Sequence, residues 1–287
     1  MFRRLGVIGT RRRWVAVLVA PTLAIVLYGA VCVWFALNQR ALLYTPGGVR
    51  MTPREAGVGW VVAVDIMTED GERLDGWWSP PPAGAGTVIY FHGTPGTLAG
   101  TAWHLIDLAQ AGLGILAIDY RGYGGSTGTP SEGGLRADAR AAFDFVRAAA
   151  PQSRVAVFGE SLGTGVAVGL ARDRAVAGVL LNAPYASMAR HWALHAPPLP
   201  YRLLLTERYD SEALIGGIGV PVMILQGKED DATPLAEARR LYAAAREPKT
   251  MIEVDGAGHL MAWAGDAKIA ALAALVSWTA REPPHSD

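Results

Sequence analysis

The chain has 287 residues, one cysteine, and 26 basic against 26 acidic residues. A single cysteine excludes a disulfide framework and a cysteine-rich zinc module, and zero net charge argues against a nucleic-acid partner. A chain of this length can bury a full core, and α/β proteins of this size often form one domain. Hydrophobic residues make up 51% of the chain and charged residues 18%, below the roughly 25% of ordinary soluble domains. We therefore expect one strongly apolar segment.

That segment is Trp14–Leu37, a run of 24 residues without a charged side chain. At about 1.5 Å of rise per residue it is long enough to cross a bilayer as one helix. Five arginines and no acid precede it. This asymmetry predicts a cytoplasmic basic head at residues 1–13, a transmembrane helix at 14–37 and an extracytoplasmic remainder. A cleaved signal peptide is the alternative, but it would have a shorter apolar region and a small-residue exit.

The rest of the chain divides into a linker at residues 38–58, one domain at 59–282 and a polar tail at 283–287. Within the domain, short β-rich runs alternate with longer helical stretches, which predicts a mostly parallel sheet with helices on both faces. The expected strands are Trp60–Thr68, Leu74–Ser79, Thr87–Phe91, Ile115–Ile118, Val155–Phe158, Val176–Leu181, Val222–Leu225 and Thr250–Val254. The expected helices are Trp103–Ala111, Leu135–Ala149, Leu162–Arg172, Leu235–Ala245 and Ala267–Thr279.

Residues 183–219 interrupt this alternation. They contain several prolines and no clear strand, with helical pieces at Met188–His195 and Tyr201–Tyr209. In a parallel sheet, an insertion between the end of one strand and the start of the next lies over the carboxyl edge, where ligands bind. We therefore expect a small cap above the ligand site.

The motif Gly159-Glu160-Ser161-Leu162-Gly163 follows an expected strand and precedes an expected helix. That is the setting of a nucleophile elbow, a turn so tight that the residues two before and two after the serine must lack bulk. The turn lifts the hydroxyl clear of the sheet, and the helix N-terminus behind it favours developing negative charge. The motif predicts Ser161 as a nucleophile.

A serine hydroxyl also needs a general base, and an acid that holds the base in the right tautomer. The elbow fold requires the chain order serine, acid, histidine, with each group after a later strand. Asp230 follows the strand ending at Leu225, and His259 follows the last expected strand. The order predicts Asp230 as the acid and His259 as the base, with Asp231 as the alternative acid. If Ser161 were an ordinary turn serine, both loops would be unexplained.

An oxyanion hole requires two backbone N–H donors that are fixed before the charge forms. One is expected from Leu162, directly after the nucleophile. The other is expected from the loop after the strand Thr87–Phe91, where Thr94 can donate and Pro95 cannot, because proline has no N–H. His92 is expected to order this loop.

Cofactor motifs are incomplete. The glycine-rich segments Asp119–Ser126 and Gly163–Gly169 lack the spacing of a phosphate loop or a dinucleotide fingerprint. His191 and His195 stand four residues apart, as metal ligands on one helix face do, but no third ligand accompanies them. We expect neither a metal nor a cofactor.

Taken together, these motifs resemble the α/β-hydrolase superfamily over roughly residues 60–280. More narrowly, the chain is similar to the branch that holds monoacylglycerol lipases, serine aminopeptidases and membrane-anchored α/β-hydrolase-domain proteins. Anchored members commonly have Asn after His-Gly, where this chain has Thr94-Pro95. In this respect the loop sequence is more similar to that of iminopeptidase-like relatives. The resemblance rests on His92–Gly96, Asp119–Ser126, Gly159–Gly163, the Asp230 and His259 loops, and Gln39–Pro46 directly after the apolar run.

The resemblance implies an eight-stranded sheet with a small cap, and it assigns Ser161 as nucleophile, His259 as base and Asp230 as acid. We accordingly expect a membrane-anchored serine hydrolase that cleaves acyl esters or thioesters, lipid-like or small, through an acyl-enzyme. Its partners would be a small-molecule acyl substrate and the bilayer. A non-catalytic anchored binding protein on the same fold is one alternative. The other is an iminopeptidase-type serine peptidase, which would need a cap carboxylate for the substrate amine: Glu207, Asp210 or Glu212.

Overall fold

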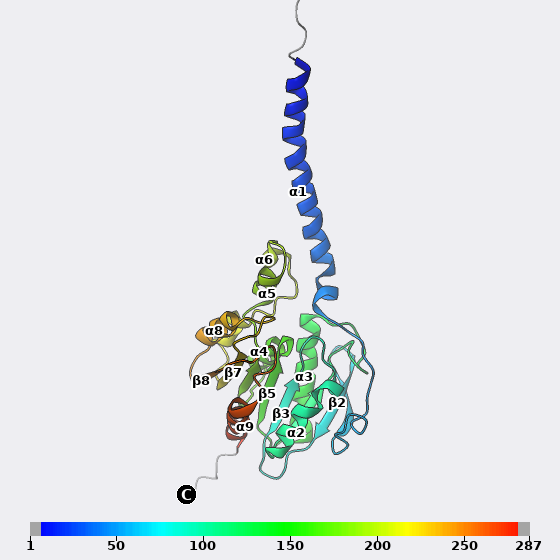
Figure 1. Cartoon of the computed structure of the whole chain (residues 1–287). Helices are drawn as coiled ribbons and strands as arrows, with labels where there is room; N and C mark the ends of the chain where they lie inside the picture. Colours follow the sequence, from blue (N-terminus) through cyan, green and yellow to red (C-terminus); the bar gives the residue numbers. More distant parts are fainter. Residues whose placement is uncertain (1–6, 281–287) are drawn as a thin grey trace, which may run out of the picture.

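The computed structural model describes the backbone of residues 7–280 and the side chains from residue 19 onward (Figure 1). Residues 1–6 of the expected basic head and the expected tail at 283–287 lie outside the described residues. A long helix, α1 (Val7–Leu43), rises from a layered α/β body. By length and composition it is a candidate membrane span, with a mean hydropathy of 2.0 over Val19–Leu43, and most of that surface is exposed.

Helix α1 continues past the apolar run instead of ending at residue 37. The last helical turns of α1 pack one face against the body of the molecule, and Phe35, Gln39 and Leu43 are buried there. Residues that we had assigned to the start of the linker therefore form helix, because the body provides packing partners for them.

The body contains a single eight-stranded sheet in the order β1-β2-β4-β3-β5-β6-β7-β8. The β1–β2 and β2–β4 pairs are antiparallel and all the others are parallel. The predicted strands are all present, and β6 lies slightly later in the chain than predicted. The strands are β1 (Val62–Met67), β2 (Arg73–Ser79), β3 (Thr87–Phe91), β4 (Gly114–Ile118), β5 (Val155–Glu160), β6 (Val179–Asn182), β7 (Val222–Gly227) and β8 (Lys249–Val254).

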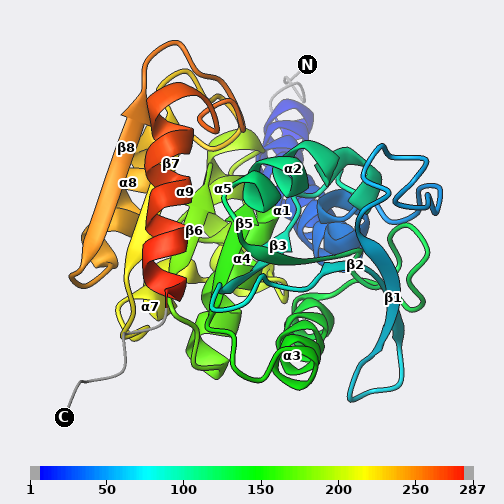
Figure 2. The same cartoon turned by 90° about the horizontal axis from the view of Figure 1, so that it is seen from below.

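Helices cover both faces of the sheet, as the alternating pattern predicts (Figure 2). On one face lie α2 (Ala102–Gln110), after a short 3-10 turn (Leu98–Thr101), and α9 (Gly265–Thr279). On the other lie α3 (Glu132–Ala149), α4 (Leu162–Asp173) and α8 (Leu235–Ala244). The cap contributes α5 (Met188–His195), α6 (Tyr201–Leu204) and α7 (Ser211–Ile215).

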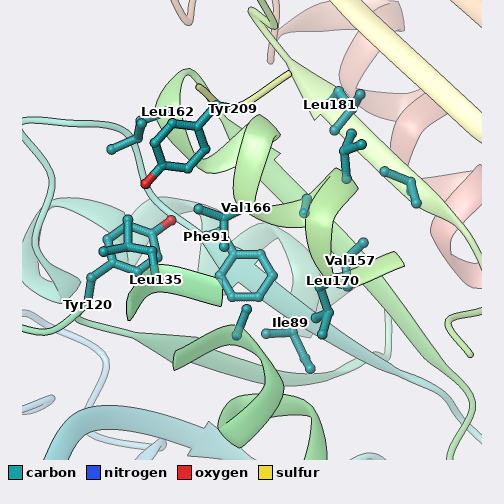
Figure 3. Close-up of a cluster of buried hydrophobic side chains, with 14 of the residues drawn as sticks. Ile89, Phe91, Tyr120, Leu135, Val157, Leu162, Val166, Leu170, Leu181 and Tyr209 are labelled. Atoms are coloured by element: carbon teal, nitrogen blue, oxygen red, sulfur yellow. The ribbon is translucent and has the colours of Figure 1, made fainter. Parts of the chain in front are cut away.

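Each face of the sheet has its own hydrophobic core. In β3, Ile89 and Phe91 enter one core while Val88 and Tyr90 enter the other, because successive strand side chains point to opposite faces. A strand buried on both sides is expected to be largely apolar, which explains the continuous hydrophobic run from Val88 to Phe91. Figure 3 shows the first core, where residues of β3 and β5 meet those of α3 and α4: Ile89, Phe91, Val157, Leu135, Val166 and Leu170.

The parallel strands β3, β5, β7 and β8 all end at one edge of the sheet. Loops that follow these strands therefore converge there, at the edge where parallel sheets bind ligands. The cap helices α5 and α6 rise beside the lower part of α1 above this body (Figure 1).

Candidate active site

Ser161 occupies the turn between β5 and α4 in a left-handed conformation, with φ of 48°. Such a conformation is strained for a residue that is not glycine, and it is common at functional sites. The turn leaves no room for side chains at its flanks. A Cβ on Gly163 would lie 2.1 Å from the Phe91 carbonyl oxygen, and one on Gly159 would lie 2.3 Å from that of Gly163. Both glycines are thus required for the serine to stand clear of the sheet.

The three residues predicted from chain order lie together in the structure. The Ser161 Oγ is 3.1 Å from Nε2 of His259, and Nδ1 of His259 is 2.9 and 3.1 Å from the two carboxylate oxygens of Asp230. Asp230 is buried, whereas Asp231 next to it is exposed. The carboxylate against the imidazole is therefore that of Asp230.

The Asp230 carboxylate is surrounded by hydrogen-bond donors from its own loop. It accepts from the backbone N–H groups of Ala232 and Thr233 at 2.9 and 2.8 Å, and from the Thr233 hydroxyl at 2.8 Å. Gln226 Nε2 donates at 3.1 Å. Burial by itself would raise the pKa of Asp230, but the hydrogen bonds from His259 and Thr233 lower it below its ordinary value. The carboxylate is therefore charged at neutral pH.

The expected oxyanion donors flank Ser161. Leu162 is the first residue of α4, so its N–H has no acceptor within the helix. The loop after β3 runs beside the serine, since a Cβ on Gly93 would lie 3.2 Å from that of Ser161. The next residue, Thr94, is half-buried, and its carbonyl accepts a 2.8 Å hydrogen bond from the hydroxyl of Thr45, just after α1.

The His92 ring lies under this loop. Its Nδ1 is 2.7 Å from the Gly93 carbonyl oxygen, and burial lowers its pKa to about 4. Asp119 lies 3.8 Å from its other nitrogen and accepts a hydrogen bond from the Leu98 N–H at 2.8 Å. Burial raises the pKa of Asp119 to about 7. His92 is thus a neutral support for the loop.

Glu160, directly before the serine, is buried and its carboxylate bonds to residues of β3, α2 and β6. Its carboxylate accepts from His104 Nε2 at 2.9 Å, from Asn182 Nδ2 at 2.7 Å, and from the Tyr90 hydroxyl. Burial raises the pKa of Glu160, but the charge and hydrogen bond of His104 and the other two donors outweigh it and lower the pKa overall. The Asn182 amide also lies 3.4 Å from the carbonyl of Leu260, the residue after His259.

Three supporting residues were not identified from the sequence. Thr233 and Gln226 hold the Asp230 carboxylate, and Asn182 connects the elbow to the histidine loop. The first two had a local signal, since they lie within the strand and loop that carry Asp230. Asn182 had none beyond its position at the end of a strand, because its partners are distant in the chain.

Where α1 meets the cap, five polar residues form what we call the anchor–cap junction: Gln39, Arg40, Tyr44, Glu207 and Tyr209. The Glu207 carboxylate is 2.7 Å from both Arg40 Nε and the Tyr44 hydroxyl, which is also 2.7 Å from the Tyr209 hydroxyl. Gln39 Oε1 accepts from the Thr206 N–H at 2.8 Å. Burial raises the pKa of Glu207, but the hydrogen bonds from Tyr44 and Arg40 lower it overall.

Asp210 and Glu212, the other two cap carboxylates that could bind a substrate amine, also interact with groups of the protein itself. The Asp210 carboxylate accepts from the Ala213 N–H at the start of α7. Glu212 forms an ion pair of 3.2 Å with Arg240.

Among the side chains that the structure describes, those of residues 19–280, no group of three or more His, Cys, Asp or Glu is arranged to hold a metal ion. The rings of His191 and His195 are 4.8 Å apart on α5.

An eight-stranded, mostly parallel sheet with a hydrogen-bonded serine, histidine and aspartate at its carboxyl edge defines the class of α/β-hydrolases. A family model described as alpha/beta hydrolase fold matches residues 86–214. The chain is 40% identical over 245 residues to the uncharacterized protein Rv2307c of Mycobacterium tuberculosis, covering 83% of this chain and 87% of that protein. The chain belongs to the α/β-hydrolase superfamily, which confirms the predicted family and fold class.

The chain is also similar to a protein named as a lipase and to the solved structure of an esterase. It is 29% identical over 207 residues to the lysophosphatidylserine lipase ABHD12 of Rattus norvegicus, covering 64% of this chain and 52% of that protein. Among solved structures, a Pyrococcus furiosus esterase, Pf2001, superposes with a TM-score of 0.66 at 21% identity, covering 82% of this chain and 96% of the esterase. At that identity the structural similarity shows the fold.

Proposed function

We propose that this chain is a membrane-anchored serine hydrolase that cleaves acyl esters through an acyl-enzyme on Ser161. One observation carries the proposal: an unbroken hydrogen-bonded series runs from the buried Asp230 through His259 to Ser161. A nucleophile, a base and a group that orients the base are what serine-based acyl transfer requires.

The mechanism follows from this series. His259 Nε2 takes the proton from the Ser161 hydroxyl as its oxygen attacks the ester carbonyl, and Asp230 stabilises the imidazolium that forms. The N–H groups of Leu162 and Thr94 stabilise the negative oxygen of the tetrahedral intermediate. His259 then gives its proton to the leaving alcohol, which leaves an acyl-enzyme. A water molecule then gives a proton to His259 and attacks the acyl carbonyl. The bond between the acyl group and Ser161 Oγ breaks, His259 returns the proton to that oxygen, and the carboxylic acid is released.

Two findings favour esters over the peptide substrates of an iminopeptidase. Glu207, Asp210 and Glu212, the cap carboxylates that could hold a substrate amine, are engaged with α1, α7 and Arg240. A relative, ABHD12, is named for lipase activity on a lysophospholipid. We propose lipid-like acyl esters as the substrates.

For the anchor, we propose that residues 14–37 span the membrane with the N-terminus in the cytoplasm and the domain at 59–282 outside. The arginines before the span and the exposed apolar surface of α1 support this topology. Protease added to intact cells should therefore digest the domain. A domain that is protected until the cells are broken would overturn the orientation.

The catalytic proposal is tested by labelling the detergent-solubilised full chain with a fluorescent fluorophosphonate. We expect the wild type and Asp231→Asn to be labelled, and Ser161→Ala and His259→Ala to show no label. Comparing p-nitrophenyl acyl esters with aminoacyl anilides then separates esterase from peptidase activity. A folded wild type that takes no label would indicate a non-catalytic binding protein and overturn the proposal.

A further inference from the structure

The segment that joins α5 to α6 lies directly against the candidate membrane span. We call residues 194–203 the cap tip. The hydroxyl of Tyr28 on α1 donates to the Pro198 carbonyl at 3.1 Å. Closer to the body, the Phe35 ring packs edge-on against Trp192 and Tyr201, with ring centres 5.3 and 5.1 Å apart. In Figure 1, α5 and α6 accordingly stand beside the lower half of α1.

The contact at Tyr28 fixes how far the cap tip reaches along the helix. The arginines that end at Arg13 set the inner boundary of the span, because charged side chains are costly in hydrocarbon. A hydrocarbon core takes about 20 helical residues, so counted from Trp14 it ends near residue 33. Tyr28 then lies about five residues, or roughly 7 Å, inside the outer boundary. A cap tip that is bonded to Tyr28 is at the same depth.

The backbone of the cap tip suits a medium without water. Lipid tails cannot satisfy N–H or carbonyl groups, so exposed irregular backbone is costly there. Pro197, Pro198 and Pro200 have no N–H to satisfy. The carbonyls of Pro197 and Pro198 accept hydrogen bonds from the Tyr201 and Tyr28 hydroxyls.

Apart from the exposed His195, the side chains of the cap tip agree with its backbone. Leu203 is 84% exposed and Leu194 is 53% exposed, which is an unfavourable arrangement in water. No acidic residue occurs from Met188 to Thr206, whereas Arg202 lies exposed beside Leu203. A long arginine side chain can extend to lipid phosphates while its stem remains among apolar groups.

We propose that the cap tip is embedded in the outer leaflet of the bilayer beside α1, so that the cap is a second membrane contact of the enzyme. This inference rests on the proposed anchor. The occupant of the exposed leucine surface is lipid, because the surface continues the lipid-facing surface of α1 and is bonded to it within the span. The tip of the cap would then lie at the level of lipid acyl chains, and the rest of the cap would lie closer to the body.

Depth-dependent fluorescence quenching tests this proposal on the full chain in phosphatidylcholine–phosphatidylglycerol vesicles. An environment-sensitive maleimide dye is attached to Leu203→Cys in a Cys32→Ser background. In a second sample, the same dye on native Cys32 of α1 reports on the anchor. In a third sample, the dye on Ile269→Cys reports on an exposed apolar position of α9, far from α1 (Figure 2). We expect doxyl-labelled lipids to quench the dyes at 203 and 32, and aqueous iodide to quench only the dye at 269.

Every other pattern overturns the proposal. Iodide quenching at 203 with lipid quenching at 32 would mean that the anchor is correct and the cap tip is in water. Iodide quenching at both positions would overturn the anchor as well. Protection of 203 from both quenchers would mean that protein, such as a second copy of the chain, covers the surface.

A functional measurement complements the spectroscopy. In a Leu194→Asp/Leu203→Asp variant, we expect hydrolysis of an ester embedded in vesicles to fall about tenfold or more, because the two carboxylates resist entry into lipid. Hydrolysis of a water-soluble short ester should be unchanged, and Ile269→Asp should leave both rates unchanged. Equal rates on the embedded ester in wild type and double variant would overturn the proposal. If neither ester is hydrolysed by wild type, the proposed catalytic function fails and the quenching result still decides the depth.

Discussion

Two buried carboxylates, Asp230 at the candidate active site and Glu207 at the anchor–cap junction, are held in opposite ways. The donors to Asp230 come from its own strand and loop and from His259, all within 29 residues of it. Glu207 is bound mainly by Arg40 and Tyr44, which lie 167 and 163 residues earlier in the chain. The first arrangement orients one imidazole, whereas the second fastens two distant parts of the molecule together.

A third buried carboxylate shows what sets the charge of these groups. Asp119 accepts one hydrogen bond, from the Leu98 N–H, and burial raises its pKa to about 7. The pKa values of Asp230 and Glu207 are lowered despite burial, because several donors stabilise the charged form. For these three carboxylates, burial alone therefore does not decide whether the group is ionised, because hydrogen-bond donors can outweigh it.

The largest effect should come from Asp230→Asn. An amide cannot hold His259 in the tautomer that accepts the serine proton, so we expect kcat on a soluble ester to fall about 10⁴-fold with little loss of stability. The matched control, Asp231→Asn, should retain wild-type kcat because that side chain is exposed. If kcat instead fell in Asp231→Asn and was unchanged in Asp230→Asn, Asp231 would be the catalytic acid.

Asp119→Asn should change the pH dependence of stability. Between the ordinary pKa of an aspartate and about 7, the folded chain holds a proton that the unfolded chain has lost. Asp119 should therefore contribute a decrease in the free energy of unfolding of about 1.4 kcal/mol per pH unit as the pH rises through this window.

The asparagine variant lacks this contribution, so its unfolding free energy should vary less over the same window. Urea unfolding of the detergent-solubilised chain at several pH values measures the slope, with the exposed Asp65→Asn as control. Equal slopes in the wild type and Asp119→Asn would contradict the prediction.

Glu207→Gln should lower the stability of the protein without changing its catalytic rate. We expect the free energy of unfolding at neutral pH to fall by about 1–3 kcal/mol, because a buried multiply bonded carboxylate is replaced. The kcat on a soluble ester should stay near the wild-type value. Since the pKa of Glu207 is lowered, its stabilisation is present above the ordinary glutamate pKa and is lost as the pH falls below it, so the two proteins should converge in acid.

Urea unfolding at neutral and acid pH checks this prediction, with Glu212→Gln at the partly exposed pair with Arg240 as control. A large loss of kcat in Glu207→Gln with unchanged stability would assign this carboxylate to the chemistry and contradict the comparison.

The smallest effect should come from Thr45→Val, which removes the hydroxyl bonded to the Thr94 carbonyl. One exposed hydrogen bond is worth about 0.5–1 kcal/mol, so we expect kcat to fall about two- to fivefold if it steadies the oxyanion loop. KM should be unchanged, and Thr52→Val, which alters a bond to Glu55 in the linker, should have no effect. If kcat is unchanged in Thr45→Val, the hydrogen bond from Thr45 does not affect the function of this loop.

The parts of the molecule that could be predicted from sequence are those with short-range signals. The elbow around Ser161 and the loops of Asp230 and His259 could be identified because each motif directly follows an apolar strand. The start of β6 was predicted too early, because Val176 is buried like a strand residue but lies before the first residue of the strand. Burial produces the apolar run, whereas the sheet is defined by hydrogen bonds.

The anchor–cap junction could not be predicted for a different reason. Gln39, Arg40 and Tyr44 look like ordinary residues at the end of an apolar segment, and Glu207 looks like one of several cap acids. Only the fold brings them together, across more than 160 positions of the chain. For the same reason, the length of α1 exceeded the expected helix: its final turns are stabilised by partners on the cap.

The burial of Phe35 between α1 and the cap means that the helix also covers part of the domain surface. A cut on the body side of Phe35 would expose the faces of Trp192 and Tyr201 that the ring now covers. A cut beyond Tyr44 would in addition leave the Glu207 carboxylate without its main partners. Either cut would therefore lower the stability of the domain that it separates from the helix.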